Sequence, residues 1–250
     1  MDVEFRSGEV TLRGHVAEPP AIAAGRRSLV LCHGFPAESW GGSAAISESY
    51  PELAERLAVE AGWVVMSFDF RGAGRSDGDF SLGGWLADVH AAVEYLLEQG
   101  DVDGVWLAGF STGGSLAICA AGEDERIRGV VTFGAPSDFD GWADDPKRFL
   151  EHARSVGVVR DRAYPPSFDA WARELSDVRP LAYVGKIPPR PVMLVHGGDD
   201  DVVPLMDARA LADAADGEVE LRTLTGGGHR LRHDPRAVAM LLGWLDRQAV

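Results

Sequence analysis

The sequence predicts an α/β fold in which helices cover both faces of a mostly parallel, doubly wound sheet. Near-continuous apolar runs, typical of strands buried on both faces, occur at residues 28–32, 63–68, 105–108, 129–133, 192–195 and 219–224. Apolar spacings of three and four, which indicate helices, occur at residues 51–61, 85–97, 114–121, 205–215 and 235–248. The alternation implies right-handed crossovers, and such sheets bind ligands beyond the carboxyl ends of their strands.

We expect one domain over residues 1–250. The chain has 250 residues, of which 46% are hydrophobic, and this is enough for a single full-sized core. The N-terminal apolar residues alternate partly by two, which predicts an antiparallel hairpin at the sheet edge. They are Val3, Phe5, Val10, Leu12 and Val16.

The net charge and the composition limit the classes of binding partner that we expect. A formal net charge of −15 would repel nucleic acid and anionic membranes, so small molecules are the expected partners, with a homodimer left open. No apolar run approaches the roughly 20 residues that span a bilayer. The first nine residues are polar and acidic, unlike a signal peptide, so we expect a cytoplasmic protein. Cys32 and Cys119 lie in apolar runs, which predicts buried packing residues rather than a disulfide framework.

The segment 136–189 interrupts the alternation of strands and helices. It has no clear strand and is too long for an ordinary connection, so we expect short helices that form a small cap. Because the segment follows strand 129–133, it should emerge at the carboxyl ends of the sheet. Four aromatic residues are therefore expected to line a substrate pocket: Trp142, Phe149, Phe168 and Trp171. A peripheral helical layer with no role in the site is the alternative.

The candidate nucleophile is Ser111. It stands in Gly109-Phe110-Ser111-Thr112-Gly113, a G-x-S-x-G pattern between strand 105–108 and the following helix. A sharp turn at this place lifts the serine hydroxyl above the sheet, and it needs glycines because a Cβ would collide with the neighbouring chain. The pattern alone is weak, and its position between a strand and a helix supports it. A serine that merely caps the next helix is the alternative.

Two later strand ends supply a candidate acid and a candidate base. A serine hydroxyl needs a base, and the base needs a third group that fixes its tautomer. Strand 192–195 is followed by three adjacent aspartates at positions 199–201, and strand 219–224 is followed by three glycines and His229. Serine, aspartate and histidine thus occur in chain order on three successive strand-end loops. His233, just before the last predicted helix, is the second candidate base.

Acyl transfer also requires two N–H donors for the developing oxyanion. One donor is expected from the residue after the nucleophile, Thr112, and the other from a loop that follows an earlier strand. Strand 28–32 is followed by His33-Gly34-Phe35-Pro36. Phe35 is the candidate in this loop, since Pro36 has no N–H to donate. A plain packing role for Phe35 is the alternative.

A glycine-containing turn at residues 69–76 could suggest a dinucleotide cofactor. However, Asp77 stands where the third glycine of G-x-G-x-x-G would be, and no helix begins at once. We therefore expect no nicotinamide cofactor. The sequence also has no separate cluster with metal-ligand spacing, so no metal is expected.

As a set, these motifs resemble the α/β-hydrolase superfamily, in particular its small intracellular esterases of the cinnamoyl or feruloyl esterase and serine aminopeptidase-like types. Residues 33–35 resemble the HGF or HGG oxyanion loop, 71–76 the RGxGxS turn, 109–113 the nucleophile elbow, and 228–229 the final GH loop. Residues 196–204 are similar to the HGxxDxxVP acid loop, which implies Asp200 as the acid, with Asp199 second. The resemblance covers nearly the whole chain and implies the α/β-hydrolase fold without a cofactor or metal.

The expected activity is hydrolysis of carboxylic esters of small to medium acyl or aryl groups. Ser111 would form the acyl-enzyme, His229 would shuttle the proton and Asp200 would orient the histidine. The same machinery also suits an acyl-peptide or thioester hydrolase. A non-catalytic member of the fold that only binds ligands is the third possibility.

Overall fold

The computed structural model describes residues 1–20, 26–37, 41–100, 102–216 and 218–248, with only the backbone described at 44–48. Its sheet has eight strands in the order β1-β2-β4-β3-β5-β6-β7-β8. The strands are β1 Asp2–Ser7, β2 Val10–Ala17, β3 Arg26–Cys32, β4 Val64–Asp69, β5 Val102–Phe110, β6 Ile127–Phe133, β7 Val192–Gly197 and β8 Glu220–Leu224. Strands β3 to β8 run parallel, whereas β1 and β2 form an antiparallel edge hairpin. The predicted fold class and hairpin are confirmed.

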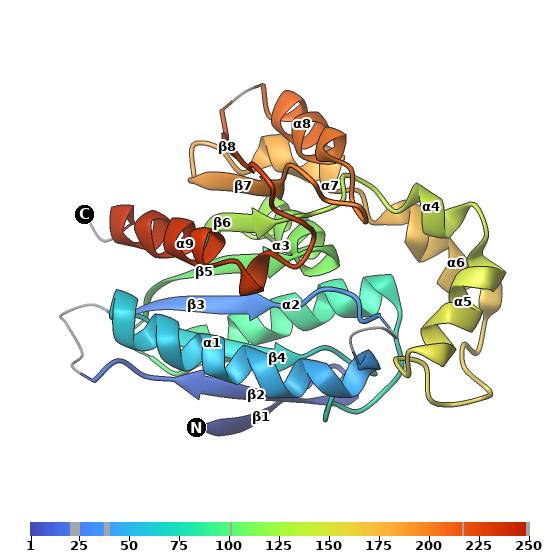
Figure 1. The fold of residues 1–250 in the computed structure, drawn as a ribbon. Coiled ribbons are helices and arrows are strands. Elements are labelled where there is room, and N and C mark those ends of the chain that lie inside the picture. Colours follow the sequence, from blue (N-terminus) through green and yellow to red (C-terminus); the bar gives the residue numbers. More distant parts are fainter. Residues whose placement is uncertain (21–25, 38–40, 101, 217, 249–250) are drawn as a thin grey trace.

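Helices cover both faces of the sheet, α1 and α9 on one face and α2, α3 and α8 on the other (Figure 1). Their bounds are α1 Ile46–Ala61, α2 Leu82–Glu98, α3 Thr112–Glu123, α8 Leu205–Ala214 and α9 Pro235–Arg247. The prediction was wrong about the start of α1, which the spacing of apolar residues placed at Pro51. The structure instead continues the helix to Ile46, after the 3-10 helix η2 Gly42–Ala45. None of the described helices is long and apolar enough to cross a bilayer.

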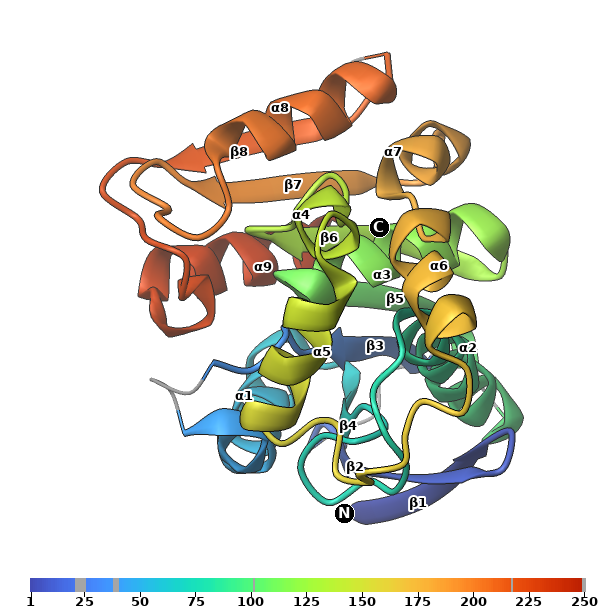
Figure 2. The ribbon, with the colours of Figure 1, turned by 90° about the vertical axis from the view of Figure 1, so that its right-hand side faces the viewer.

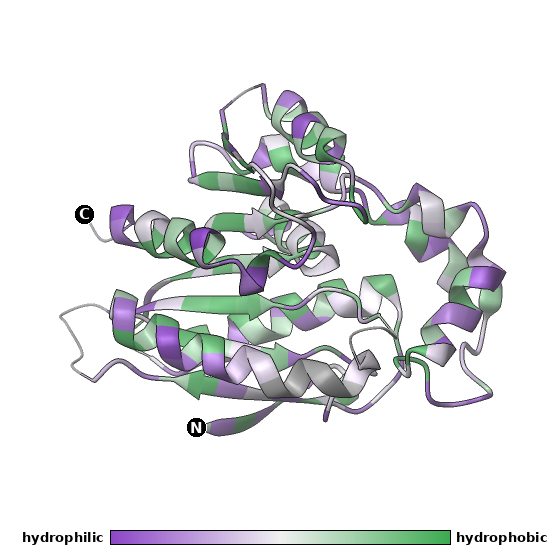
Figure 3. Cartoon of the chain, viewed as in Figure 1, coloured by the Kyte–Doolittle hydropathy of each residue, from purple (hydrophilic) through white to green (hydrophobic). Residues whose placement is uncertain are grey.

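The core lies on both faces of the central strands. Every residue of β4 and β7 is buried, as expected for parallel strands between two helical layers. Trp85 of α2 and Trp244 of α9 are the largest fully buried side chains, one on each face. Cys32 and Cys119 are free and buried, as predicted. Figure 3 shows this pattern, with apolar strands inside and polar residues on the outer turns of the helices.

The segment 136–189, which is described throughout, contains no strand. Its elements are α4 Asp140–Ala143, α5 Pro146–Ser155, α6 Phe168–Asp177, α7 Pro180–Tyr183 and the 3-10 helix η3 Val184–Lys186. Side chains cap two of these helices: Asp145 accepts from the Arg148 amide and Ser167 from the Ala170 amide. Helices α4, α5 and α6, hereafter the cap, lie across the carboxyl ends of the strands (Figure 2). Helix α7 and η3 instead pack on α3 and α8 and extend the layer that covers the sheet.

Candidate active site

The turn between β5 and α3 presents Ser111. Ser111 has φ of 52°, a left-handed conformation that is uncommon for a residue with a side chain. Its amide donates to the Phe133 carbonyl of the neighbouring strand at 2.8 Å. A Cβ on Gly109 would collide with the backbone of Gly113, and a Cβ on Gly113 would collide with the His33 carbonyl. The side chain of Ser111 makes no capping hydrogen bond to α3, which leaves its hydroxyl for the site.

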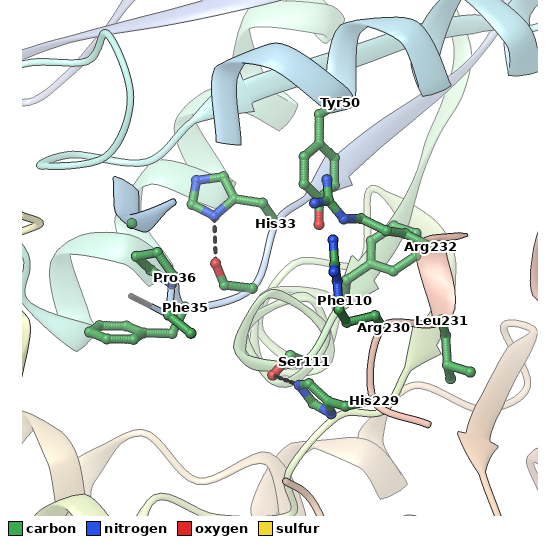
Figure 4. A pocket seen from close by; sticks show the side chains of 13 residues that line it. His33, Phe35, Pro36, Tyr50, Phe110, Ser111, His229, Arg230, Leu231 and Arg232 are labelled. Atoms are coloured by element: carbon green, nitrogen blue, oxygen red, sulfur yellow. Dashed lines mark hydrogen bonds between the residues drawn. The ribbon is translucent and has the colours of Figure 1, made fainter. Parts of the chain in front are cut away.

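Three side chains from separate strand ends meet here. His229 Nε2 lies 3.0 Å from Ser111 Oγ, an interaction drawn in Figure 4. On the other side of the ring, His229 Nδ1 lies 2.9 Å from Asp200 Oδ2 and 3.1 Å from Oδ1. The Asp200 side chain is fully buried, and that of His229 is 6% exposed. With Nδ1–H donating to the carboxylate, Nε2 faces Ser111 as an acceptor.

The loop after β7 holds Asp200 in place. Its Oδ1 accepts hydrogen bonds from the amides of Val202 at 3.0 Å and Val203 at 2.9 Å. Burial would raise the pKa of Asp200, but the hydrogen bonds from His229 and from these amides outweigh it and hold that pKa below its usual value. The neighbouring Asp199 is exposed, and its amide donates to Gly227. The structure thus brings Asp200, rather than Asp199, to the histidine.

The second candidate base is placed elsewhere. His233 belongs to the 3-10 helix η4 Leu231–His233, and its Nε2 lies 3.1 Å from Arg230 Nη2. His229 is therefore the histidine that the structure joins to Ser111.

Gly134, which belongs to none of the predicted motifs, also shapes the site. Gly134 follows β6 with φ of +62°, and a Cβ there would lie 3.2 Å from Asp200 Oδ2 and 3.4 Å from His229 Nδ1. Any side chain would press on the contact between Asp200 and His229. A glycine directly after a predicted strand was the available signal.

The loop after β3 lies against the nucleophile, since a Cβ on Gly34 would come within 2.9 Å of Ser111 Cβ. His33 fastens this loop: its Nδ1 lies 2.8 Å from the Gly34 carbonyl, and its Nε2 accepts from the Phe70 amide at 3.1 Å. Burial lowers the pKa of His33 to about 4, so its ring is neutral and Nδ1 is the donor. Within the described chain, the amides of Phe35 and Thr112 donate to no protein acceptor.

A pocket opens beside Ser111 and His229 (Figure 4). Tyr50 of α1 and Phe110 of the elbow form part of its wall, with ring centroids 5.8 Å apart. Burial raises the pKa of Tyr50 to about 12, so its phenol stays protonated. The described lining residues are His33, Gly34, Phe35, Pro36, Ala37, Gly42, Tyr50, Phe110, Ser111, His229, Arg230, Leu231 and Arg232.

The four aromatic residues expected to line a substrate pocket are not part of this one. Trp142 stacks on Phe149 at 4.1 Å between ring centroids. Trp171 is 2% exposed, and its indole N–H donates to the Phe80 carbonyl at 3.0 Å. Phe168 is half-buried, with its ring 6.1 Å from that of Trp171.

The cap aromatics therefore attach the cap to the body of the protein. Short amphipathic helices must bury their apolar faces, and here they do so against one another and against Phe80. Phe35 is the link to the site, because it lines the pocket and also lies 5.1 Å from the Trp142 ring and 5.3 Å from the Phe149 ring.

The fold and this arrangement of strand-end side chains define an α/β hydrolase. The sequence matches the model of the alpha/beta hydrolase family over residues 29–241, and the chain belongs to this family. The resemblance noted from the motifs is confirmed at this level.

Individual relatives are distant. An uncharacterized protein, YfhR of Escherichia coli O157:H7, is 28% identical over 174 residues, which are 68% of this chain and 54% of that protein. The chain thus spans about half the length of this relative. The structure of the alpha/beta hydrolase GrgF from Penicillium sp. sh18 is similar with a TM-score of 0.75 and 22% identity, covering 99% of this chain and 98% of that one. Est1E from Butyrivibrio proteoclasticus, solved with ferulic acid bound, has a TM-score of 0.72 and 22% identity, covering 99% and 97%.

Proposed function

We propose that this chain is a serine hydrolase that cleaves carboxylic esters of small to medium acyl or aryl groups. The observation that carries the proposal is the 3.0 Å contact between Ser111 Oγ and His229 Nε2, with Asp200 on the opposite ring nitrogen. An isolated serine hydroxyl is a poor nucleophile, and this is the arrangement that activates it.

In the proposed mechanism, Ser111 Oγ attacks the ester carbonyl while His229 Nε2 accepts the hydroxyl proton. The tetrahedral oxyanion is stabilised by the amides of Phe35 and Thr112, whose N–H groups have no protein acceptor in the described chain. The intermediate collapses when His229 returns the proton to the departing alcohol. Water then attacks the acyl-enzyme with His229 again as base, and the carboxylic acid leaves. Asp200 stays ionised throughout and holds the ring.

The pocket supports a small or aryl acyl group. Phe35, Tyr50 and Phe110 supply aromatic walls beside Ser111, and aromatic surfaces suit planar or short apolar groups. Est1E, which shares the fold, was solved with ferulic acid, an aryl acid. Acyl-peptide and thioester hydrolysis would use the same side chains, and comparing ester, thioester and amide substrates of one acyl group separates these activities.

Labelling with a fluorophosphonate probe tests the proposal. We expect the wild type to be labelled at Ser111, and Ser111→Ala to lose labelling and about 10⁴-fold or more of its ester turnover. Ser176→Ala, on the cap helix α6, is the control and should keep both. Circular dichroism checks that each variant is folded. A folded wild type that is neither labelled nor active would instead support a non-catalytic binding protein.

A further inference from the structure

Two arginines line the pocket beside Ser111, although the protein as a whole is acidic. The chain has 39 Asp and Glu residues against 24 Lys and Arg. Among the described residues that line the pocket, however, Arg230 and Arg232 are the only members of these four types. Both follow His229 in the same turn. Ester hydrolysis itself needs no such pair, so its presence calls for a separate explanation.

Within the part of the chain that the structure describes, the groups that contact the guanidinium of Arg232 are neutral. One of its nitrogens donates to the Ser49 hydroxyl, and its Cζ lies 4.9 Å from the centre of the Tyr50 ring. These partners orient the guanidinium without cancelling its charge, and a guanidinium has five N–H donors in a planar fork. The charge acts within the pocket: it adds to burial in lowering the pKa of His33, and it opposes the rise that burial causes in the pKa of Tyr50.

Arg230 contributes a second guanidinium to the same wall. Its Nη2 lies 3.1 Å from His233 Nε2. Partial burial, together with the charges of Arg232 and Arg230, lowers the pKa of His233, which favours the neutral ring that can accept this hydrogen bond. In Figure 4 the Arg230 side chain lies between Tyr50 and the Ser111–His229 pair, and the Arg232 guanidinium lies beside the Tyr50 ring.

We propose that Arg232 and Arg230 bind an oxyanion group of the substrate, a carboxylate or a phosphate, so that the enzyme prefers esters that carry such a group over neutral esters. Guanidinium forks bind these groups through paired, charge-assisted hydrogen bonds. The neighbouring Tyr50, Phe110 and Leu231 would pack on the chain between the oxyanion and the ester. This inference rests on the proposed function and adds the substrate class. The arginines act as specificity-determining residues and take no part in proton transfer.

Matched ester pairs test the preference. The substrates are the monomethyl esters of succinate, glutarate and adipate, each paired with the methyl ester of the corresponding monoamide, which is neutral and of similar shape. Methanol release gives kcat and KM. For at least one chain length we expect kcat/KM to be about 10- to 100-fold higher for the carboxylate, the typical value of a charge-assisted hydrogen bond, and to fall as salt is added. Methyl 4-phosphonobutanoate, measured alongside, shows whether a phosphoryl group is preferred to a carboxylate.

Variants assign the preference to Arg232. Arg232→Gln should lose about 10- to 100-fold on the carboxylate ester, mainly through KM, and much less on the monoamide ester. Arg232→Lys should recover part of the loss, because it keeps the charge without the fork. The control is Arg209→Gln, which removes one charge from an exposed arginine of α8 and should leave the preference unchanged. Equal rates within every ester pair, or equal losses on both members in Arg232→Gln, would overturn the proposal.

A binding measurement separates this proposal from the proposed function. If the wild type cleaves none of these esters, calorimetry on folded Ser111→Ala decides, because binding does not require the nucleophile. Tighter binding of the carboxylate esters than of the monoamide esters, lost in Ser111→Ala combined with Arg232→Gln, would support the arginine site even though ester hydrolysis had failed. Equal binding of the two members of each pair would overturn it.

Discussion

Phe35 lies between two regions that are rich in aromatic side chains. The rings have different structural roles in these two regions. On one side, Tyr50 and Phe110 line a pocket beside Ser111 and His229. On the other, Phe149 and Trp171 are 6% and 2% exposed and pack within the cap. Both regions lie at the carboxyl ends of the strands. The difference shows that aromatic content near a site does not identify a ligand pocket, because short helices that need an apolar anchor bury their rings first.

The largest expected effect is on the pocket side, where single side chains should decide activity. Asp200→Asn should lower kcat for an ester by about 10⁴-fold, because the side-chain amide of the introduced asparagine favours the wrong tautomer of His229. Asp199→Asn should stay within about threefold, because exposed side chains away from the site have small effects. Steady-state kinetics of the two folded variants is the measurement. The opposite ranking would move the acid to Asp199.

On the cap side we expect stability to change more than selectivity. Trp171→Ala and Phe149→Ala should each lower the free energy of unfolding by about 3–5 kcal/mol, as is usual when a large buried aromatic is removed. Denaturant titration measures this, with the half-buried Phe168→Ala as the milder comparison. If either buried variant keeps its stability but changes its preference among acyl groups, the cap aromatics belong to the substrate site and the two regions do not differ in this way.

The loop shared by the two regions predicts a pH effect on stability. Folding lowers the pKa of His33 to about 4, mainly through burial, whereas an unfolded histidine titrates near ~6.5. Between these values the unfolded chain binds more protons, so the stability present above pH ~6.5 is lost as the pH falls toward 4, by on the order of 3 kcal/mol.

Urea midpoints of the wild type and of His33→Gln between pH 4 and 7 check this effect. The variant should depend less steeply on pH, and His90→Gln, on the surface of α2, controls for the loss of any histidine. Identical slopes for the wild type and His33→Gln would exclude His33 as the source.

The sequence was sufficient to predict the sheet, because its strands are apolar runs. It was also sufficient to predict where Ser111, Asp200 and His229 lie, because each of these three residues stands in a short motif at the end of such a run. Such motifs consist of residues that are adjacent in the sequence, so they can be recognised without the structure. The pocket wall was not predictable in this way. Tyr50 is one apolar residue of an amphipathic helix, and Arg232 resembles an ordinary surface charge, until the fold brings α1 against the turn after β8.

The packing of the cap aromatics was not predictable from the sequence for the same reason. Their partner Phe80 precedes them by more than sixty positions in the printed sequence, and no spacing within residues 136–189 indicates that contact. The rings of Phe80 and Phe149 lie 5.7 Å apart in the folded protein.

The strand order also has a consequence for how activity arises during synthesis and refolding. Ser111 follows β5 in the middle of the sheet, whereas Asp200 and His229 follow β7 and β8 at its edge, and His229 is 118 residues later in the chain than Ser111. A nascent chain that has folded only as far as β6 carries the serine without the histidine, so we expect it to lack the proposed esterase activity. Ester turnover therefore requires that the last strands, β7 and β8, have paired with the sheet. After dilution from denaturant, we expect turnover to recover later than the circular dichroism signal of the helices.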